Sequence, residues 1–139
     1  MPDGKILAIG GTTYQNSSAN KIMAAELFDP VTEKWTTLPA MTVPRLYHST
    51  GVLLKDGRVW VAGTTPSRLT NELRVEYFVP SYYSAARPTI SGAPTVEGYG
   101  QTITIPTPDA QRINAVSLVM LSSQTHAGNS DQRLVWLQI

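Results

Sequence analysis

Residues 3–11 are Asp3-Gly4-Lys5-Ile6-Leu7-Ala8-Ile9-Gly10-Gly11, and a similar order of residue types returns at 56–63 as Asp56-Gly57-Arg58-Val59-Trp60-Val61-Ala62-Gly63. In both copies a turn glycine precedes a basic residue, an apolar run and a terminal glycine. A short apolar run bounded by glycines is typical of a buried β-strand. Gly4 and Gly57 lie 53 residues apart, so each repeating unit is long enough to contain several strands.

The rest of the chain also favours β-structure, because β-branched and aromatic residues alternate with polar ones between turn-forming clusters. The best helical candidate, residues 22–28, is short and runs into Asp29-Pro30, so we expect a strand there too. Further strands are expected at 50–54 and 74–80. After a loop at 81–87 the pattern of residue types changes. Four short strand candidates follow, at residues 88–91, 100–105, 115–120 and 134–139.

We therefore predict an all-β protein with two parts, residues 1–87 and residues 88–139. The spacing of the four late strands suits an antiparallel sandwich of immunoglobulin type, although such a sandwich usually has about seven strands. The chain opens on a turn and closes on the strand-like run 133–139. We expect from these edges that it is a fragment of a longer protein.

Composition excludes several classes of function. The 11 Lys and Arg residues nearly balance the 10 Asp and Glu residues, and no run of like charge offers a footprint for nucleic acid or an anionic membrane surface. The sequence has no cysteine, so disulfides, thiolate metal ligands and thiol nucleophiles are excluded for this chain. No segment has the pattern of a signal peptide or the length of an apolar membrane span.

The two histidines, His48 and His126, are the residues best suited to metal binding and proton transfer. They lie 78 residues apart, in different predicted parts of the chain. Their spacing alone forms no metal motif, so structural or merely exposed roles stay open.

Several segments resemble one known family, the kelch-propeller copper radical oxidases of the galactose oxidase and glyoxal oxidase type. The repeat of about 50 residues resembles kelch blades, as do the Gly10-Gly11 pair, the Asp29-Pro30 turn and Trp35. The segment Arg45-Leu46-Tyr47-His48-Ser49 resembles the one that supplies adjacent tyrosine and histidine copper ligands in that family. Thr125-His126, followed by residues 131–134, resembles the loop that brings a further histidine to the same metal.

The resemblance implies that the chain is the carboxy-terminal portion of such an enzyme. Its fold would be a partial kelch-type β-propeller over residues 1–87, followed by a partial immunoglobulin-like, early-set β-sandwich over residues 88–139. His48 and His126 would be equatorial ligands of one copper ion, and Tyr47 an axial ligand and the catalytic base. The substrates would be aldehydes or primary alcohols together with O2, which is reduced to H2O2, and the location would be extracellular. Arg45 either orients Tyr47 or pairs with a carboxylate, and we favour the pairing.

One departure from the family pattern affects activity. These enzymes use a radical tyrosine crosslinked to a cysteine, and a chain without cysteine cannot form that cofactor. We therefore expect the chain to be inactive alone and to need the missing N-terminal propeller blades. The closeness of the resemblance favours aldehydes of the glyoxal type.

Two other readings stay open. The chain could be a non-catalytic kelch and sandwich module that binds carbohydrate or protein, or a gene product without an independent function. Separately, Asn16-Ser17-Ser18 fits the N-glycosylation pattern, which also occurs by chance.

Overall fold

The computed structural model describes residues 1–65, 71–120, 122–125 and 128–139. Its regular structure consists of short antiparallel strands and three 3-10 turns, η1 (Ser18–Asn20), η2 (Ser81–Ser84) and η3 (Ala110–Arg112). The predicted all-β class is confirmed. No helix in the described ranges is long and apolar enough to cross a membrane.

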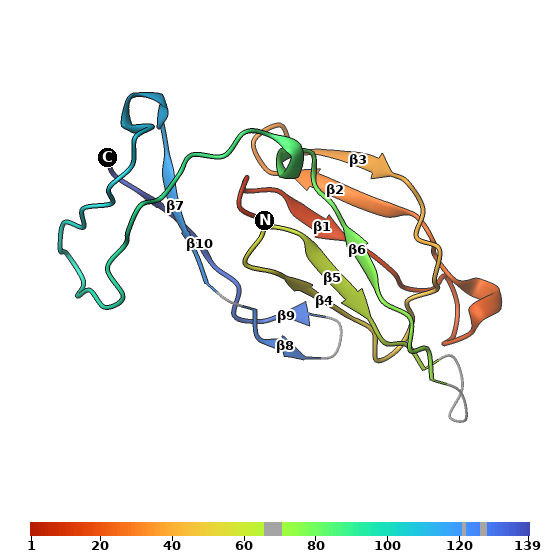
Figure 1. Cartoon of the computed structure of the whole chain (residues 1–139). Helices are drawn as coiled ribbons and strands as arrows, with labels where there is room; N and C mark the ends of the chain where they lie inside the picture. The colour runs from red at the N-terminus through yellow and green to blue at the C-terminus, as the bar shows by residue number, and fades with distance from the viewer. Residues whose placement is uncertain (66–70, 121, 126–127) are drawn as a thin grey trace.

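Two three-stranded sheets form the first part of the molecule (Figure 1). One has the order β1 (Ile6–Ala8), β2 (Ala25–Asp29), β3 (Lys34–Leu38), and the other has the order β4 (Thr50–Leu53), β5 (Val59–Ala62), β6 (Glu76–Phe78). The two copies of the sequence repeat lie on β1 and β5. Residues 25–29 form a strand rather than a helix, as expected, and the Asp29-Pro30 turn connects β2 to β3.

The core of this part is small. Leu53, Val59 and Val61 form its buried cluster, and Leu7, Ile9 and Phe78 are among the partly buried side chains that pack against it. Since Leu7 and Ile9 come from the β1 segment and Phe78 from β6, the cluster joins the two sheets.

The last part of the chain contains a long antiparallel hairpin. Its base is β7 (Val116–Val119) paired with β10 (Leu134–Leu137), and its tip is the short pair β8 (Gln124–Thr125) and β9 (Gly128–Asn129). The tip contacts β4 of the preceding sheet, and Val119 reaches the core cluster. These two short strands lie outside the four late strand candidates of the sequence analysis.

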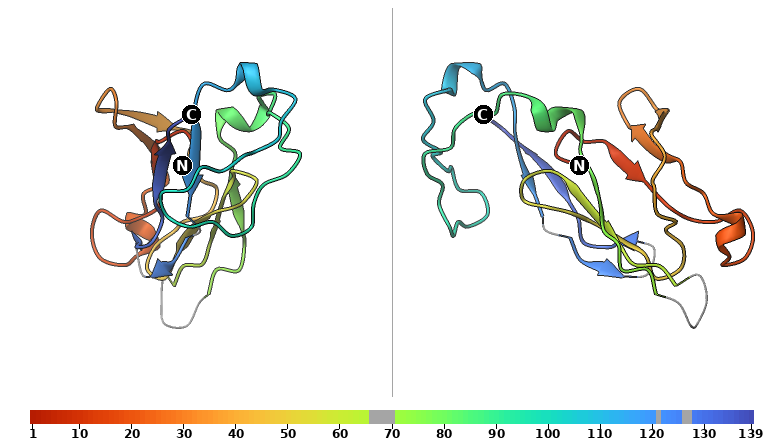
Figure 2. Two further views of the ribbon diagram at one scale, coloured as in Figure 1. Left: turned by 90° about the vertical axis from the view of Figure 1, so that its left-hand side faces the viewer. Right: turned by 45° about the vertical axis from the view of Figure 1, so that its right-hand side comes forward.

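The predicted strands at 88–91 and 100–105 are wrong. Within the described ranges neither segment pairs with a strand. Ser91 N donates to Pro106 O at 2.8 Å. The backbone amides and carbonyls of a strand need hydrogen-bond partners on a neighbouring strand. Alternating apolar and polar residues do not by themselves supply that neighbour. In Figure 1 and the right view of Figure 2 this segment loops out at the end of the molecule opposite β3.

Candidate functional site

Tyr47 and His48 lie side by side on the loop that leads into β4. Their ring centroids are 3.8 Å apart, with the ring planes tilted by 31°. Both side chains are exposed, Tyr47 to 54 %. His48 has a left-handed backbone conformation, with φ of 64°, which is uncommon for a residue other than glycine. Such a conformation persists where the surrounding structure holds it in place.

Backbone contacts from the ends of two strands hold this loop. Gly11 N donates to Arg45 O at 2.7 Å, and Thr65 N donates to Tyr47 O at 2.7 Å. The Thr64 hydroxyl accepts from Leu46 N at 2.8 Å. The loop is thus attached to the segment after β1 and to the segment after β5, which are the ends of the two repeat copies.

Close approach at these attachment points requires glycine. A Cβ on Gly10 would lie 2.5 Å from Arg45 O, and a Cβ on Gly63 would lie 2.5 Å from His48 O. Real Cβ atoms do not come so near a backbone oxygen, and both glycines also have positive φ. The terminal glycines of the repeat therefore give the Tyr47–His48 loop its place.

Arg45 lies beneath the loop as a buried charge, exposed to 1 %. Its guanidinium donates to Gly63 O and to Arg74 O, each at 2.9 Å, and pairs with Glu76 Oε2 at 3.3 Å. The expected pairing of Arg45 with a carboxylate is confirmed. The hydrogen bonds that the guanidinium makes with described residues run to two backbone carbonyls and to Glu76.

Glu76, which is partly buried, completes the network around Arg45. Its carboxylate accepts from Thr42 N at 2.7 Å, from the Thr42 hydroxyl at 2.8 Å and from Val43 N at 3.2 Å. Burial pushes the pKa of Glu76 upward, but these hydrogen bonds and the charge of Arg45 outweigh it, so the pKa lies below its ordinary value. Glu76 is therefore ionised at neutral pH.

His48 presents one ring nitrogen to the protein. Its Nδ1 lies 3.3 Å from the Thr65 hydroxyl, and among the described residues no hydrogen-bond partner is recorded for Nε2. A histidine that binds a metal through one nitrogen commonly has the other held by a polar group of the protein. The arrangement leaves Nε2 as the available ligand atom, next to the Tyr47 phenol.

The predicted ligand His126 lies outside the described residues. The residues before it, Gln124 and Thr125, belong to β8, which contacts β4. Gln124 also lines a cavity of about 390 Å³ together with Tyr47, Ser49 and Asn16. The hairpin thus brings a segment distant in sequence to the side of the Tyr47–His48 loop.

The described residues meet part of the requirement of a copper site. An imidazole nitrogen and a phenol oxygen are donors that suit Cu(II), and Tyr47 and His48 present both at one exposed place. In the described parts of the chain no group of three or more His, Cys, Asp or Glu residues is placed to hold a metal. Tyr47 and His48 together offer two such donors, so a complete copper site would need further ligands.

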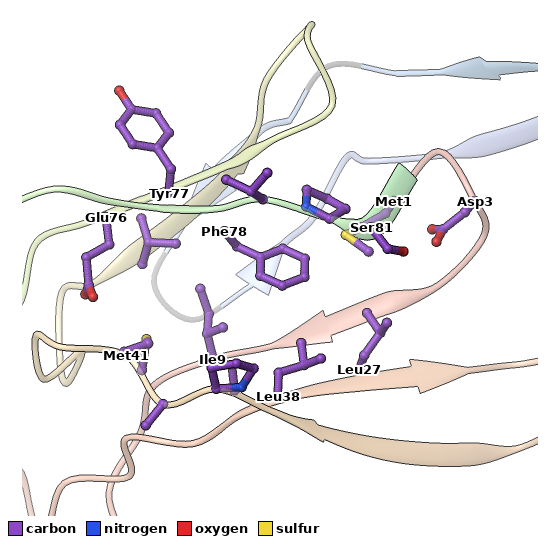
Figure 3. Close-up of a pocket in the computed structure, with 16 residues that line it drawn as sticks. Met1, Asp3, Ile9, Leu27, Leu38, Met41, Glu76, Tyr77, Phe78 and Ser81 are labelled. Carbon is purple, nitrogen blue, oxygen red and sulfur yellow. The ribbon is translucent and has the colours of Figure 1, made fainter. Parts of the chain in front are cut away.

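A second cavity, of about 490 Å³, is lined mainly by apolar residues. It lies between the two three-stranded sheets, and apolar side chains such as Ile9, Leu27, Leu38 and Phe78 point into it (Figure 3). Tyr77 turns away from it in the same view. This cavity belongs to the packing between the sheets.

Sequence reasoning missed three polar residues around the loop. Thr64, Thr65 and Glu76 carry no motif, because their role depends on neighbours from other strands. Asn16 was singled out only as a possible glycan acceptor, yet its side chain accepts from Tyr47 N at 3.1 Å.

Two family models together match nearly the whole chain. Residues 1–82 match the family described as glyoxal oxidase N-terminus, and residues 87–139 match the galactose oxidase-like early set domain. The aldehyde oxidase GLOX of Vitis pseudoreticulata is 30 % identical over 100 % of this chain and 31 % of its own length. A galactose oxidase of Gibberella zeae is also 30 % identical, over 100 % of this chain and 22 % of its own length.

A solved structure shares the fold. It is a fungal alcohol oxidase of the AA5 family in complex with copper, 33 % identical, with a TM-score of 0.87 over 99 % of this chain and 31 % of the other. The chain spans less than a third of the length of the two curated relatives named above.

Proposed function

The chain belongs to the family of glyoxal oxidases and galactose oxidases, and from that membership we propose that it supplies part of the copper site of an oxidase. The proposed ligands are Tyr47, His48 and His126, and Tyr47 is the proposed base. The observation that carries the proposal is the Tyr47–His48 pair, held on a loop by both repeat ends, with His48 Nδ1 engaged and Nε2 available. The proposal includes an extracellular location, as the resemblance implies.

The reaction proposed is the two-electron oxidation of an aldehyde or a primary alcohol. A primary alcohol loses two electrons and two protons to become an aldehyde, a hydrated aldehyde loses the same to become a carboxylic acid, and O2 takes them up as H2O2. Bound copper would supply the one-electron redox couple. Tyr47 would accept the hydroxyl proton of the substrate at its phenolate oxygen, and His48 would keep its place through Thr65.

The chain alone is proposed to be inactive. Without a cysteine it cannot form a tyrosine–cysteine radical, so residues outside these 139, such as further propeller blades, would have to supply it. Purified chain loaded with copper should produce no H2O2 from glyoxal, methylglyoxal or galactose in a peroxidase-coupled assay. Peroxide production by this chain, with metal-free chain as the blank, would contradict the proposal.

Copper titration followed by electron paramagnetic resonance tests the proposed ligands. We expect one Cu(II) per chain, with a tetragonal signal from nitrogen and oxygen ligands. His48→Ala, His126→Ala and Tyr47→Phe should each change the signal and weaken binding by about tenfold or more, since each removes a ligand. Tyr99→Phe, at a fully exposed tyrosine outside the site, should leave both unchanged.

The same experiment addresses the second candidate function, a non-catalytic module that binds carbohydrate or protein. The absence of cysteine is the observation that favours it. A folded chain that takes up no Cu(II), or whose Cu(II) signal is indifferent to both histidine substitutions, would refute the copper proposal and leave the binding module as the better account.

A further inference from the structure

The side-chain amide of Asn16 joins two segments around the Tyr47–His48 pair. Its Oδ1 accepts from Tyr47 N at 3.1 Å, and its Nδ2 donates to Thr65 O at 2.7 Å. Asn16 is exposed and lies 31 residues before Tyr47 and 49 residues before Thr65 in sequence. We propose that Asn16 is a positioning residue that sets the orientation of Tyr47 and His48 toward a bound metal.

The contacts around Asn16 close into a ring. Thr65 N donates to Tyr47 O at 2.7 Å, and the Thr65 hydroxyl lies 3.3 Å from His48 Nδ1. Asn16 therefore acts on Tyr47 directly and on His48 through Thr65. The backbone N–H and C=O of Tyr47 are both engaged, so its phenol is presented from a peptide held on both sides.

The loop that carries Asn16 is itself fixed. The Thr12 hydroxyl donates to Gln15 O at 2.6 Å, and Asn20 Nδ2 donates to Tyr14 O at 2.7 Å. Thr13 N also donates to Asn20 O at 3.0 Å. A side chain on a loop closed by its own hydrogen bonds can hold a neighbour, because it has little freedom to follow that neighbour's movement.

The positioning role competes with a glycan at the same nitrogen. Asn16 is the acceptor residue of the triplet Asn16-Ser17-Ser18, and a sugar on Nδ2 would share the atom that donates to Thr65 O. Ser18→Ala removes the glycosylation pattern and leaves the Asn16 side chain intact, so it separates the two roles.

Four versions of the 139-residue chain, made in a secreting eukaryotic host, test the inference: wild type, Asn16→Ala, Asn16→Asp and Ser18→Ala. In the metal-free chains, amide exchange at Tyr47 should be faster by about tenfold in Asn16→Ala, since one hydrogen bond is lost. Asn16→Asp keeps an acceptor for Tyr47 N and should stay close to wild type at that amide. Ser18→Ala should match wild type.

The copper-binding part of this experiment rests on the proposed function. The Asn16→Ala chain should bind Cu(II) about tenfold to a hundredfold more weakly than wild type, the usual effect of losing a residue that orients a metal ligand. The parallel hyperfine splitting of its Cu(II) spectrum should also shift. Asn16→Asp should be intermediate, because it cannot donate to Thr65 O.

The outcomes separate this inference from the proposed function. Wild-type chain that binds Cu(II) beside an Asn16→Ala chain with the same affinity and spectrum would overturn the positioning role. A loss in Ser18→Ala as large as in Asn16→Ala would overturn it in favour of a glycan. Wild-type chain that takes up no Cu(II) would instead overturn the proposed function, and amide exchange alone would then decide whether Asn16 holds Tyr47.

Discussion

Two glycines, Gly10 and Gly63, lie against the backbone of the loop that carries Tyr47 and His48. At the scale of single residues this contact explains why the repeat ends in glycine in both copies. The same loop rests on Arg45, a buried guanidinium whose charge is met by Glu76. Removing one partner of a buried ion pair leaves the other uncompensated, which costs far more than an exposed pair contributes. Loop position and local stability therefore depend on the same few residues.

Gly63→Ala should destabilise the chain more than an alanine at a glycine with the same conformation but open surroundings. Gly63 and Gly100 have φ of 75° and 73°, and only the Cβ at position 63 would meet a backbone oxygen. We expect a loss of about 3 kcal/mol for Gly63→Ala, the sum of left-handed strain and steric conflict, and about 1 kcal/mol for Gly100→Ala. Urea denaturation measures both, and equal losses would refute the argument.

Glu76 should make stability depend on pH in the acid range. Its folded-state pKa lies below the ordinary value of 4.5, so its contribution is present above pH 4.5 and is lost as the pH falls through the folded value. Glu76→Gln should lose about 2 kcal/mol at pH 7 and show a flatter acid limb in thermal melts.

Glu72 provides a comparison for that measurement. Hydrogen bonds from Arg74 lower the pKa of Glu72 to about 2, so any contribution of its pair with the exposed Arg74 persists to lower pH than 4.5. We expect Glu72→Gln to change the melting temperature at pH 7 much less than Glu76→Gln. A larger effect of Glu72→Gln would show that the buried network is not the main source of the acid sensitivity.

At the scale of elements, the 3-10 turn η2 attaches the end of the first part to the β4–β5 turn. The Tyr82 hydroxyl donates to Gly57 O at 2.7 Å, and Arg87 Nη2 donates to Asp56 O at 2.7 Å. The Arg87 guanidinium also lies over the Tyr83 ring, 5.1 Å from its centroid. These contacts give the chain a fixed direction as it leaves β6, although the segment that follows forms no strand.

Tyr82 should be the last tyrosine to ionise. Burial raises the pKa of Tyr82 to about 12, so spectroscopic titration of the folded chain should show one phenol that the Tyr82→Phe variant lacks. Tyr82→Phe should also cost about 1 kcal/mol, because Gly57 O loses its donor. Tyr14→Phe, at an exposed tyrosine, is the control. Ionisation of every phenol near pH 10 would contradict this prediction.

At the scale of the whole molecule, the buried core is small for a chain of 139 residues. Large apolar side chains stay exposed on the faces of both ends, among them Ile6, Trp35, Leu118, Val135 and Trp136, each more than half exposed. Apolar surface of this extent usually marks an interaction face or a tendency to associate. The hairpin tip on β4 and Val119 on the core cluster connect the two ends through few contacts.

We expect the isolated chain to self-associate at micromolar concentration. Sedimentation should show species larger than the 15.1 kDa chain, and Trp35→Lys should shift the distribution toward monomer because it places a charge on the exposed face. Thr32→Lys, in the exposed turn between β2 and β3, adds the same charge away from that face and is the control. A monomer that melts cooperatively would refute the expectation.

The sequence by itself predicted the strands that form β1, β2, β4, β5 and β6 but not β3 (Lys34–Leu38), and its resemblance to a known family pointed to Tyr47 and His48. Repeat glycines and alternating apolar residues act locally, over the few residues that form one strand or turn. The prediction of strands at 88–91 and 100–105 was wrong because a strand must pair with another strand. The alternation of apolar and polar residues does not provide that partner.

Only the tertiary structure decided what surrounds the two ligand candidates. Asn16, Thr65 and Glu76 reach the loop from 31, 17 and 31 residues away, and β8 comes to β4 from the far end of the chain. Hydrogen bonds between such distant residues depend on how sheets pack against each other, and no local pattern in the sequence records that packing.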